Sequence, residues 1–146
     1  MDTTAAARTV QGDTAVTRAL SKYVVEASYL DFPQETIELT KALLLKTVTG
    51  MLVGSKEPVG RRLTRYVAAS RGSPDVGLVG GGLRTSVDLA ALAHGVFAHG
   101  SEYEDDQFPG MVGTYWVYPA IFPLAEHLIS DGKEIITAAA SCWEVA

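Results

Sequence analysis

One long apolar stripe in the first third of the chain constrains its fold more than any other feature. Ile37, Leu44, Val48 and Met51 follow one another at separations of seven, four and three residues. This spacing places their side chains on one side of an α-helix. Gly54 follows the stripe and should end the helix, which is long and apolar enough to be the centre of a bundle. Leu52 also belongs to the stripe, and further apolar residues widen it: Leu39, Leu43 and Leu45.

Helical spacing and helix end signals recur along the rest of the chain, which predicts an all-α fold, a helical bundle. Residues 1–12 have no apolar period and are expected to be a flexible lead-in. The glycine-rich stretch 75–82 is too short for a helix and predicts a short extended or hairpin-like segment near residues 76–85. Further helices are expected to begin at or next to Asp13 or Thr14, Pro58, Thr85 or Ser86, Pro119 and Glu134.

Composition limits the classes of function. The chain has 146 residues, of which 47% are hydrophobic and 20% charged, and this suits one globular domain, expected over residues 13–146. A net charge of −5 provides no basic surface for phosphates, so nucleic acid is not an expected partner. The sequence shows neither a bilayer-spanning apolar run nor a secretory signal, so no membrane partner is expected. The single cysteine, Cys142, fits a reducing compartment, and we predict a cytoplasmic protein.

A change from apolar to acidic residues marks the candidate site. The run Val87–Ala98 is almost wholly apolar, contains His94, and is followed by His99 and four carboxylates. A buried helix that delivers histidine and carboxylates to a loop can place proton-transfer groups at the edge of a core. The loop is expected to run from about Gly100 to Thr114. Its acids are Glu102, Glu104, Asp105 and Asp106.

Other interpretations of these residues stay open. The acids also fit an ordinary solvated loop after a core helix. A Ca²⁺ or Mg²⁺ site at these acids is a further interpretation, although their spacing is not that of an EF-hand loop. His94 and His99 are five residues apart, which does not match the usual helical pair of metal ligands, so no metal is expected. Either histidine is alternatively a packed structural residue.

Several stretches, taken in order, resemble the MmgE/PrpD family. Leu43–Pro58 is similar to the second-helix signature of the family, and Glu102–Asp106 is similar to its acidic loop with one aromatic residue. The resemblance extends from about Ala19 to Ala146 and depends on the order of the motifs. The other similar stretches are Val79-Gly80, Arg84–Ser86, Ala91–His99, Tyr118–Glu126 and Cys142–Ala146.

The resemblance implies the helical domain of a lyase or epimerase that acts on small di- or tricarboxylates. Family members include 2-methylcitrate dehydratases and cis-aconitate decarboxylases, which are typically cofactor-independent homodimers with a helical domain and a smaller α/β lid. The resemblance therefore implies a small polycarboxylate substrate, no cofactor, and assembly as a homo-oligomer or with a companion chain. The chain resembles only the first part of that helical domain, and its last helix is still apolar at Ala146, as expected of a truncated domain.

The acidic loop of the family assigns candidate roles by position. Glu102 falls where the family has a catalytic-site aspartate, and Asp106 falls where it has a threonine. The family's loop histidine falls on Val112, which cannot transfer a proton. The resemblance thus implies candidates for two roles. The catalytic candidates are Glu102, Asp105, Asp106 and His99, and the substrate-binding candidates are Tyr103 and Glu104.

The same loop lacks the cations that a polycarboxylate needs. No lysine, arginine or histidine lies between Ser101 and Glu126, and acids alone repel an anionic substrate. The cations are therefore expected from another domain or a partner chain. Two hypotheses follow: a lyase or isomerase segment, or a catalytically inactive, truncated helical module that assembles with a partner or with itself.

Overall fold

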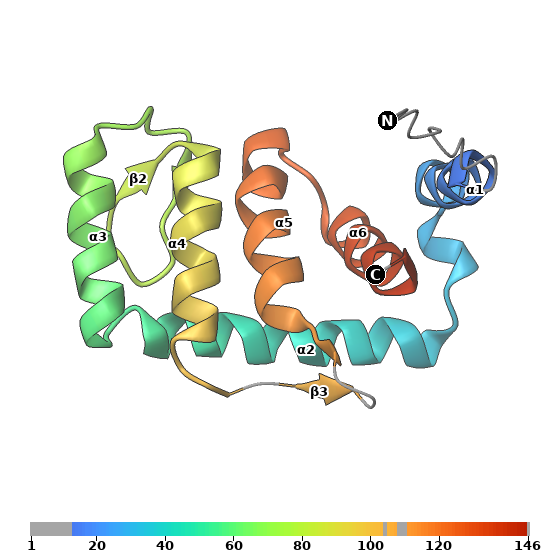
Figure 1. Cartoon of the computed structure of the whole chain (residues 1–146), viewed down its shortest axis with the longest axis horizontal. Helices are drawn as coiled ribbons and strands as arrows, with labels where there is room; N and C mark the ends of the chain where they lie inside the picture. The colour runs from blue at the N-terminus through green and yellow to red at the C-terminus, as the bar shows by residue number, and fades with distance from the viewer. Residues whose placement is uncertain (1–12, 104, 108–110, 146) are drawn as a thin grey trace, which may run out of the picture.

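The computed structural model describes residues 13–103, 105–107 and 111–145, and within them the fold is all-α, as predicted. The expected lead-in, residues 1–12, lies outside the described residues, as does Glu104. Figure 1 shows the arrangement of the helices. They are α1 (Asp13–Glu26), α2 (Gln34–Gly54), α3 (Pro58–Ser70), α4 (Val87–His99), α5 (Thr114–Leu128) and α6 (Gly132–Val145), with a 3₁₀ turn, η1, at Tyr29–Asp31.

The central helix predicted from the apolar stripe is α2. It runs crosswise beneath α3, α4 and α5 in Figure 1 and contacts α4, α5 and α6. Met51 is fully buried and Ile37 is 4% exposed, so the predicted stripe faces the other helices. The prediction is wrong at one position of the stripe and at two positions of its widening, because α2 is covered on one side only. The exposed residues are Leu52 of the stripe and Leu39 and Leu45 of the widening.

The helices α2 and α4 approach each other closely at Gly54. A Cβ atom at this position would lie 1.8 Å from the carbonyl oxygen of Phe97 on α4. Phe97 and Met51 are both fully buried in one hydrophobic cluster beside this contact. The backbones of two core helices therefore touch here, and only glycine permits that distance.

The predicted hairpin-like segment is confirmed. β1 (Val76–Gly77) pairs antiparallel with β2 (Arg84–Thr85), and Val76 lies opposite Thr85. The Glu126 carboxylate on α5 accepts hydrogen bonds from the Gly77 N–H and from Arg84 Nη1, each at 3.0 Å. The hairpin is thereby attached to the helical bundle.

His94 is a structural residue beneath this hairpin. It is 1% exposed, and its Nε2 accepts a hydrogen bond of 3.0 Å from the Val79 N–H. Its Nδ1 is buried with no hydrogen-bond partner among the described residues. Burial lowers the pKa of the His94 imidazole from 6.5 to about 4, and the negative charge of Glu126 opposes this only in part.

This burial predicts an acid-sensitive fold. The unfolded chain binds a proton at His94 more readily than the folded chain, so the free energy of unfolding falls as the pH drops from 6.5 toward 4. Between pH 7 and pH 5 the expected loss from this residue is about 2 kcal/mol. Urea unfolding of the wild type and of His94→Gln at both pH values measures it, because the variant should lack this part of the slope. His127→Gln, at an exposed histidine, is the control and should keep the wild-type slope; equal slopes in the wild type and His94→Gln would contradict the assignment.

Two expectations for residues 100–119 are wrong. The expected loop contains a second antiparallel pair, β3 (Asp106–Gln107) with β4 (Met111–Val112), because strands of two residues are too short for a sequence period to reveal. The helix expected to open at Pro119 begins at Thr114, so Pro119 and Pro123 lie inside α5. Both prolines are buried, and burial of this helix outweighs the backbone hydrogen bonds that they remove.

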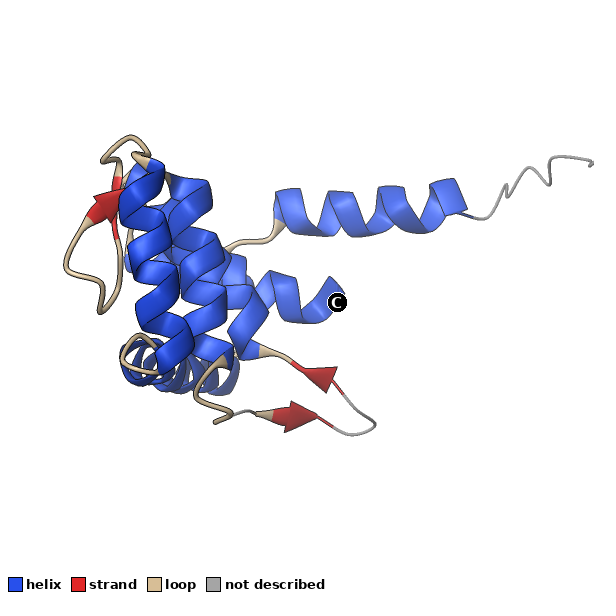
Figure 2. Cartoon of the chain, turned by 60° about the vertical axis from the view of Figure 1, so that its left-hand side comes forward, coloured by secondary structure: helices blue, strands red, loops and turns tan. Residues whose placement is uncertain are grey.

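The first helix is largely exposed and contacts the bundle only in part, at α6. Figure 2 shows α1 extending away from the other helices. Its residues from Ala15 to Glu26 are all exposed, including the apolar side chains of Val16 at 59%, Leu20 at 41% and Val24 at 46%. Within the described residues, no helix has the length and apolarity that a membrane crossing requires.

Candidate functional site

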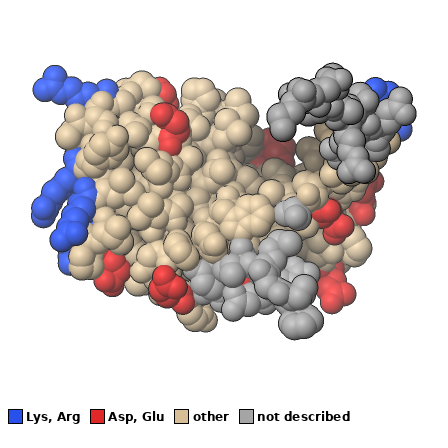
Figure 3. Space-filling view, viewed as in Figure 1, with Lys and Arg blue, Asp and Glu red and all other residues tan. Residues whose placement is uncertain are grey.

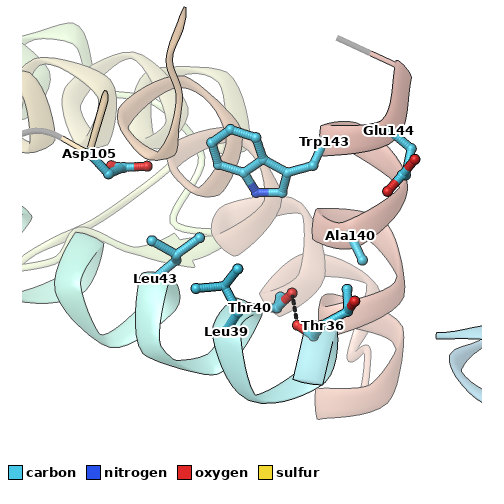
Figure 4. A pocket seen from close by; sticks show the side chains of 8 residues that line it. All are labelled: Thr36, Leu39, Thr40, Leu43, Asp105, Ala140, Trp143 and Glu144. Carbon is cyan, nitrogen blue, oxygen red and sulfur yellow. Dashed lines mark hydrogen bonds between the residues drawn. The ribbon is translucent and has the colours of Figure 1, made fainter. Parts of the chain in front are cut away.

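A cavity between α2 and α6 contains one of the predicted site residues. Its volume is about 390 Å³, within the usual size of small-molecule sites. Figure 4 shows Asp105 at one end, Glu144 at the other and Trp143 between them, with the Asp105 carboxylate pointing toward Trp143. The remaining lining residues are Thr36, Leu39, Thr40, Leu43 and Ala140.

Asp105 is held by two residues from different helices. The Lys46 ammonium, from the middle of α2, donates to Asp105 Oδ1 at 2.5 Å. The hydroxyl of Thr114, the first residue of α5, donates to the same oxygen. The side chains of Lys46 and Asp105 are 19% and 23% exposed, so this ion pair is partly shielded from water and is stronger than a surface pair.

Lys46 is a site residue that the sequence analysis missed. It lies 59 residues before Asp105, and we expected the cations of the site to come from another domain or chain. The structure shows one cation of this chain beside the acidic loop. The sequence signal was a single lysine directly after Leu43, Leu44 and Leu45, in the most apolar stretch of α2. Figure 3 shows many of the other cations gathered along the α3 edge of the molecule, where Arg61, Arg62 and Arg65 are exposed.

A buried tyrosine of α5 is hydrogen-bonded to Thr40, one of the residues that line the cavity. Tyr118 is fully buried, and its hydroxyl donates to the Thr40 carbonyl oxygen at 2.9 Å. Burial raises the pKa of the Tyr118 phenol far above its ordinary value, the Trp143 indole opposes this, and the negative charge of Asp105 adds to it. Tyr118 therefore stays neutral and acts as a hydrogen-bond donor to α2.

Trp143 forms one wall of the cavity and packs against the start of α5. A Cβ atom at Gly113 would lie 1.6 Å from Trp143 Cη2, so glycine is needed for this contact. The indole Nε1 is buried, and no acceptor among the described residues lies at hydrogen-bonding distance and angle from it. Gly113 immediately precedes Thr114, so the Trp143 wall and the support of Asp105 are built at the same helix end.

The structure does not place Glu102, His99 or Tyr103 in this cavity. Glu102 is exposed, has a φ of 50°, and donates its N–H to the His99 carbonyl oxygen at 3.0 Å. The exposed His99 ring stacks on Tyr115 with 4.5 Å between ring centroids, and both residues border a separate apolar groove between α4 and α5. The catalytic roles assigned to Glu102 and His99 thus stay predictions, as they receive no support from this geometry.

The remaining predicted residues lie near Lys46 or outside the described part of the chain. The Tyr103 ring, 70% exposed, lies with its centroid 5.9 Å from Lys46 Nζ, close enough for a cation–π contact. Asp106 pairs through its backbone with Val112 in the β3–β4 hairpin, and its side chain is outside the described structure. Glu104 is outside it entirely. No cluster of potential metal ligands is present within residues 13–103, 105–107 and 111–145.

Comparison with known proteins identifies a family. A family model described as the MmgE/PrpD N-terminal domain matches residues 18–146. No curated protein and no solved structure matches the chain. The match begins within α1 and includes every residue that lines the cavity.

Proposed function

The chain belongs to the MmgE/PrpD family, and from this membership we propose that it contributes to a lyase or isomerase reaction on a small di- or tricarboxylate. Family membership supports dehydratase-like chemistry, in which a proton moves on the carbon next to a carboxylate. The observation that supports a site in this chain is the cavity that ends at Asp105. Its volume of about 390 Å³ suits a substrate of this size.

We propose Asp105 as the base of this reaction. A base must approach the substrate proton directly, and among the described side chains Asp105 is the predicted catalytic residue that lines the cavity. Its carboxylate is oriented by Lys46 and Thr114, and the Lys46 ammonium balances its negative charge. Glu144 lies at the other end of the cavity, where a second carboxylate is available for proton transfer.

The cavity also indicates where further residues are needed. Its described lining contains two carboxylates, Asp105 and Glu144, and no lysine or arginine. A di- or tricarboxylate would be repelled unless cations approach from outside this lining. We therefore propose that a second copy of the chain, or a companion chain, supplies them, which agrees with the homodimer implied by the family resemblance.

Deuterium exchange tests the proposed reaction. The folded protein is incubated in D₂O with citrate, 2-methylcitrate or cis-aconitate and followed by NMR. We expect deuterium to enter the carbon next to a carboxylate, or a dehydrated or isomerised product to form, in the native sample and not in a heat-denatured one. Absence of both from a folded sample with every substrate would contradict an active site formed by this chain and its own copies.

The second candidate is an inactive helical module, and one observation favours it. The apolar side chains of Val16, Leu20 and Val24 on α1 are exposed, which is typical of a helix that packs against another chain. Under this proposal the protein would associate and bind no carboxylate. The exchange experiment separates the two, because an assembled protein without exchange or product supports the module only.

A further inference from the structure

Lys46 and Thr114 have a role that neither the family match nor the acidic loop assigns. Both donate to the same oxygen of Asp105, Oδ1, from helices that are far apart in the chain. Lys46 lies on α2 and Thr114 opens α5, so the loop residue Asp105 is fixed to two rigid elements. Thr114 is fully buried, which leaves its hydroxyl little freedom to turn elsewhere.

The direction of the hydrogen bonds follows from the number of protons. A threonine hydroxyl has one proton, and Thr114 donates it to Asp105. The contact of 3.0 Å between Lys46 Nζ and Thr114 Oγ1 is therefore donated by lysine. Lys46 thus supports Asp105 directly and also through Thr114, so the three side chains form one closed set of contacts.

Both contacts are made to Oδ1 of the Asp105 carboxylate, and neither is made to Oδ2. Oδ2 of Asp105 has no hydrogen-bond partner among the described residues, while Asp105 lines the cavity and its carboxylate points toward Trp143. A carboxylate that accepts two hydrogen bonds at one oxygen is held against rotation, and its second oxygen keeps a defined direction. We propose that Lys46 and Thr114 are positioning residues that hold Asp105 Oδ1 so that Oδ2 meets the substrate. This proposal rests on the proposed function.

The alternative is an ordinary ion pair that only joins the loop to α2. The other ion pairs of the described residues are on the surface, with side chains between 43% and 70% exposed, and none of their residues lines the cavity. The Lys46–Asp105 pair is far less exposed and lies at the cavity. Both roles predict some loss of stability on mutation, so the test needs a measurement that a purely structural role would not change.

The kinetics of the exchange reaction give that measurement. Lys46→Met and Thr114→Val should each lower kcat about 10- to 100-fold while KM changes less than about threefold, because a misdirected base still permits binding. Thr114→Ser keeps the hydroxyl and should restore most of the rate. Lys41→Met, which removes an exposed ion pair with Glu38 on the same helix, is the matched control and should have no effect. Unchanged kcat in Lys46→Met, or a loss confined to KM, would overturn the proposal.

If the wild type shows no exchange, the proposed function fails. A second measurement then still tests whether Lys46 and Thr114 position Asp105. The NMR couplings of the Asp105 Cβ protons report whether its side chain holds one rotamer. We expect one rotamer in the wild type and in Thr114→Ser, and averaging in Lys46→Met and Thr114→Val. A single rotamer in all four proteins would show that Lys46 and Thr114 do not position Asp105.

Discussion

Replacing Gly54 with alanine is expected to destabilise the protein by about 3 kcal/mol, because two core helices would have to separate. The added Cβ would lie 1.8 Å from the Phe97 carbonyl oxygen, which belongs to the backbone and cannot move like a flexible side chain. The α2–α4 contact would open, and the buried cluster around Met51 and Phe97 would loosen. Chemical unfolding measures the change in the free energy of unfolding.

Gly95 provides a control at which alanine should raise, and not lower, the free energy of unfolding. It lies in α4, and a Cβ there would meet no atom within 4 Å. Because alanine is the better helix former, Gly95→Ala should stabilise the protein by about 0.5–1 kcal/mol. Equal effects of the two substitutions would show that helix propensity, and not the close contact at Gly54, determines the result.

Replacing Asp105 with asparagine is expected to reduce the exchange rate about 100- to 10,000-fold. Asparagine has nearly the same shape and can still accept from Lys46 and Thr114, but its amide is not a base. The fold should therefore persist while proton transfer stops. Deuterium incorporation measures the rate, and thermal unfolding of the same sample confirms that the protein is folded.

Glu102→Gln is the decisive companion variant. The family resemblance assigns Glu102 to a catalytic position, whereas the structure places it outside the cavity, on an exposed turn with a φ of 50°. We expect Glu102→Gln to retain exchange within about threefold of the wild-type rate, since uncoupled surface substitutions have small effects. Loss of exchange in Glu102→Gln with retention in Asp105→Asn would return the catalytic role to the residue that the resemblance indicates.

Local signals in the sequence were sufficient for much of the fold. The spacing of Ile37, Leu44, Val48 and Met51 predicts α2 because burial of one helix side repeats every three to four residues. The glycines of residues 75–82 predict the first hairpin because they interrupt helical spacing. Both features depend on neighbours in the sequence, and both are found in the structure.

The features that sequence reasoning missed depend on contacts between distant residues. Local rules place Pro119 in the first turn of a helix, but in α5 it lies inside the helix and is buried among other helices. Lys46 becomes part of the site only when α2 crosses the acidic loop, and no spacing rule links it to Asp105. The choice of Asp105 over Glu102 likewise depends on which carboxylate the β3–β4 hairpin directs into the cavity.

The most direct test of the site is an NMR titration of the ¹⁵N-labelled protein with 2-methylcitrate. The chain has two tryptophans, and their indole N–H signals are separate probes: Trp143 lines the cavity beside Asp105, and Trp116 borders the groove between α4 and α5. If the cavity binds the substrate, the Trp143 signal shifts saturably, the Trp116 signal stays in place, and Asp105→Asn alters the midpoint of the titration. A shift of Trp116 alone, or of neither signal in a folded sample, would contradict a substrate site at Asp105.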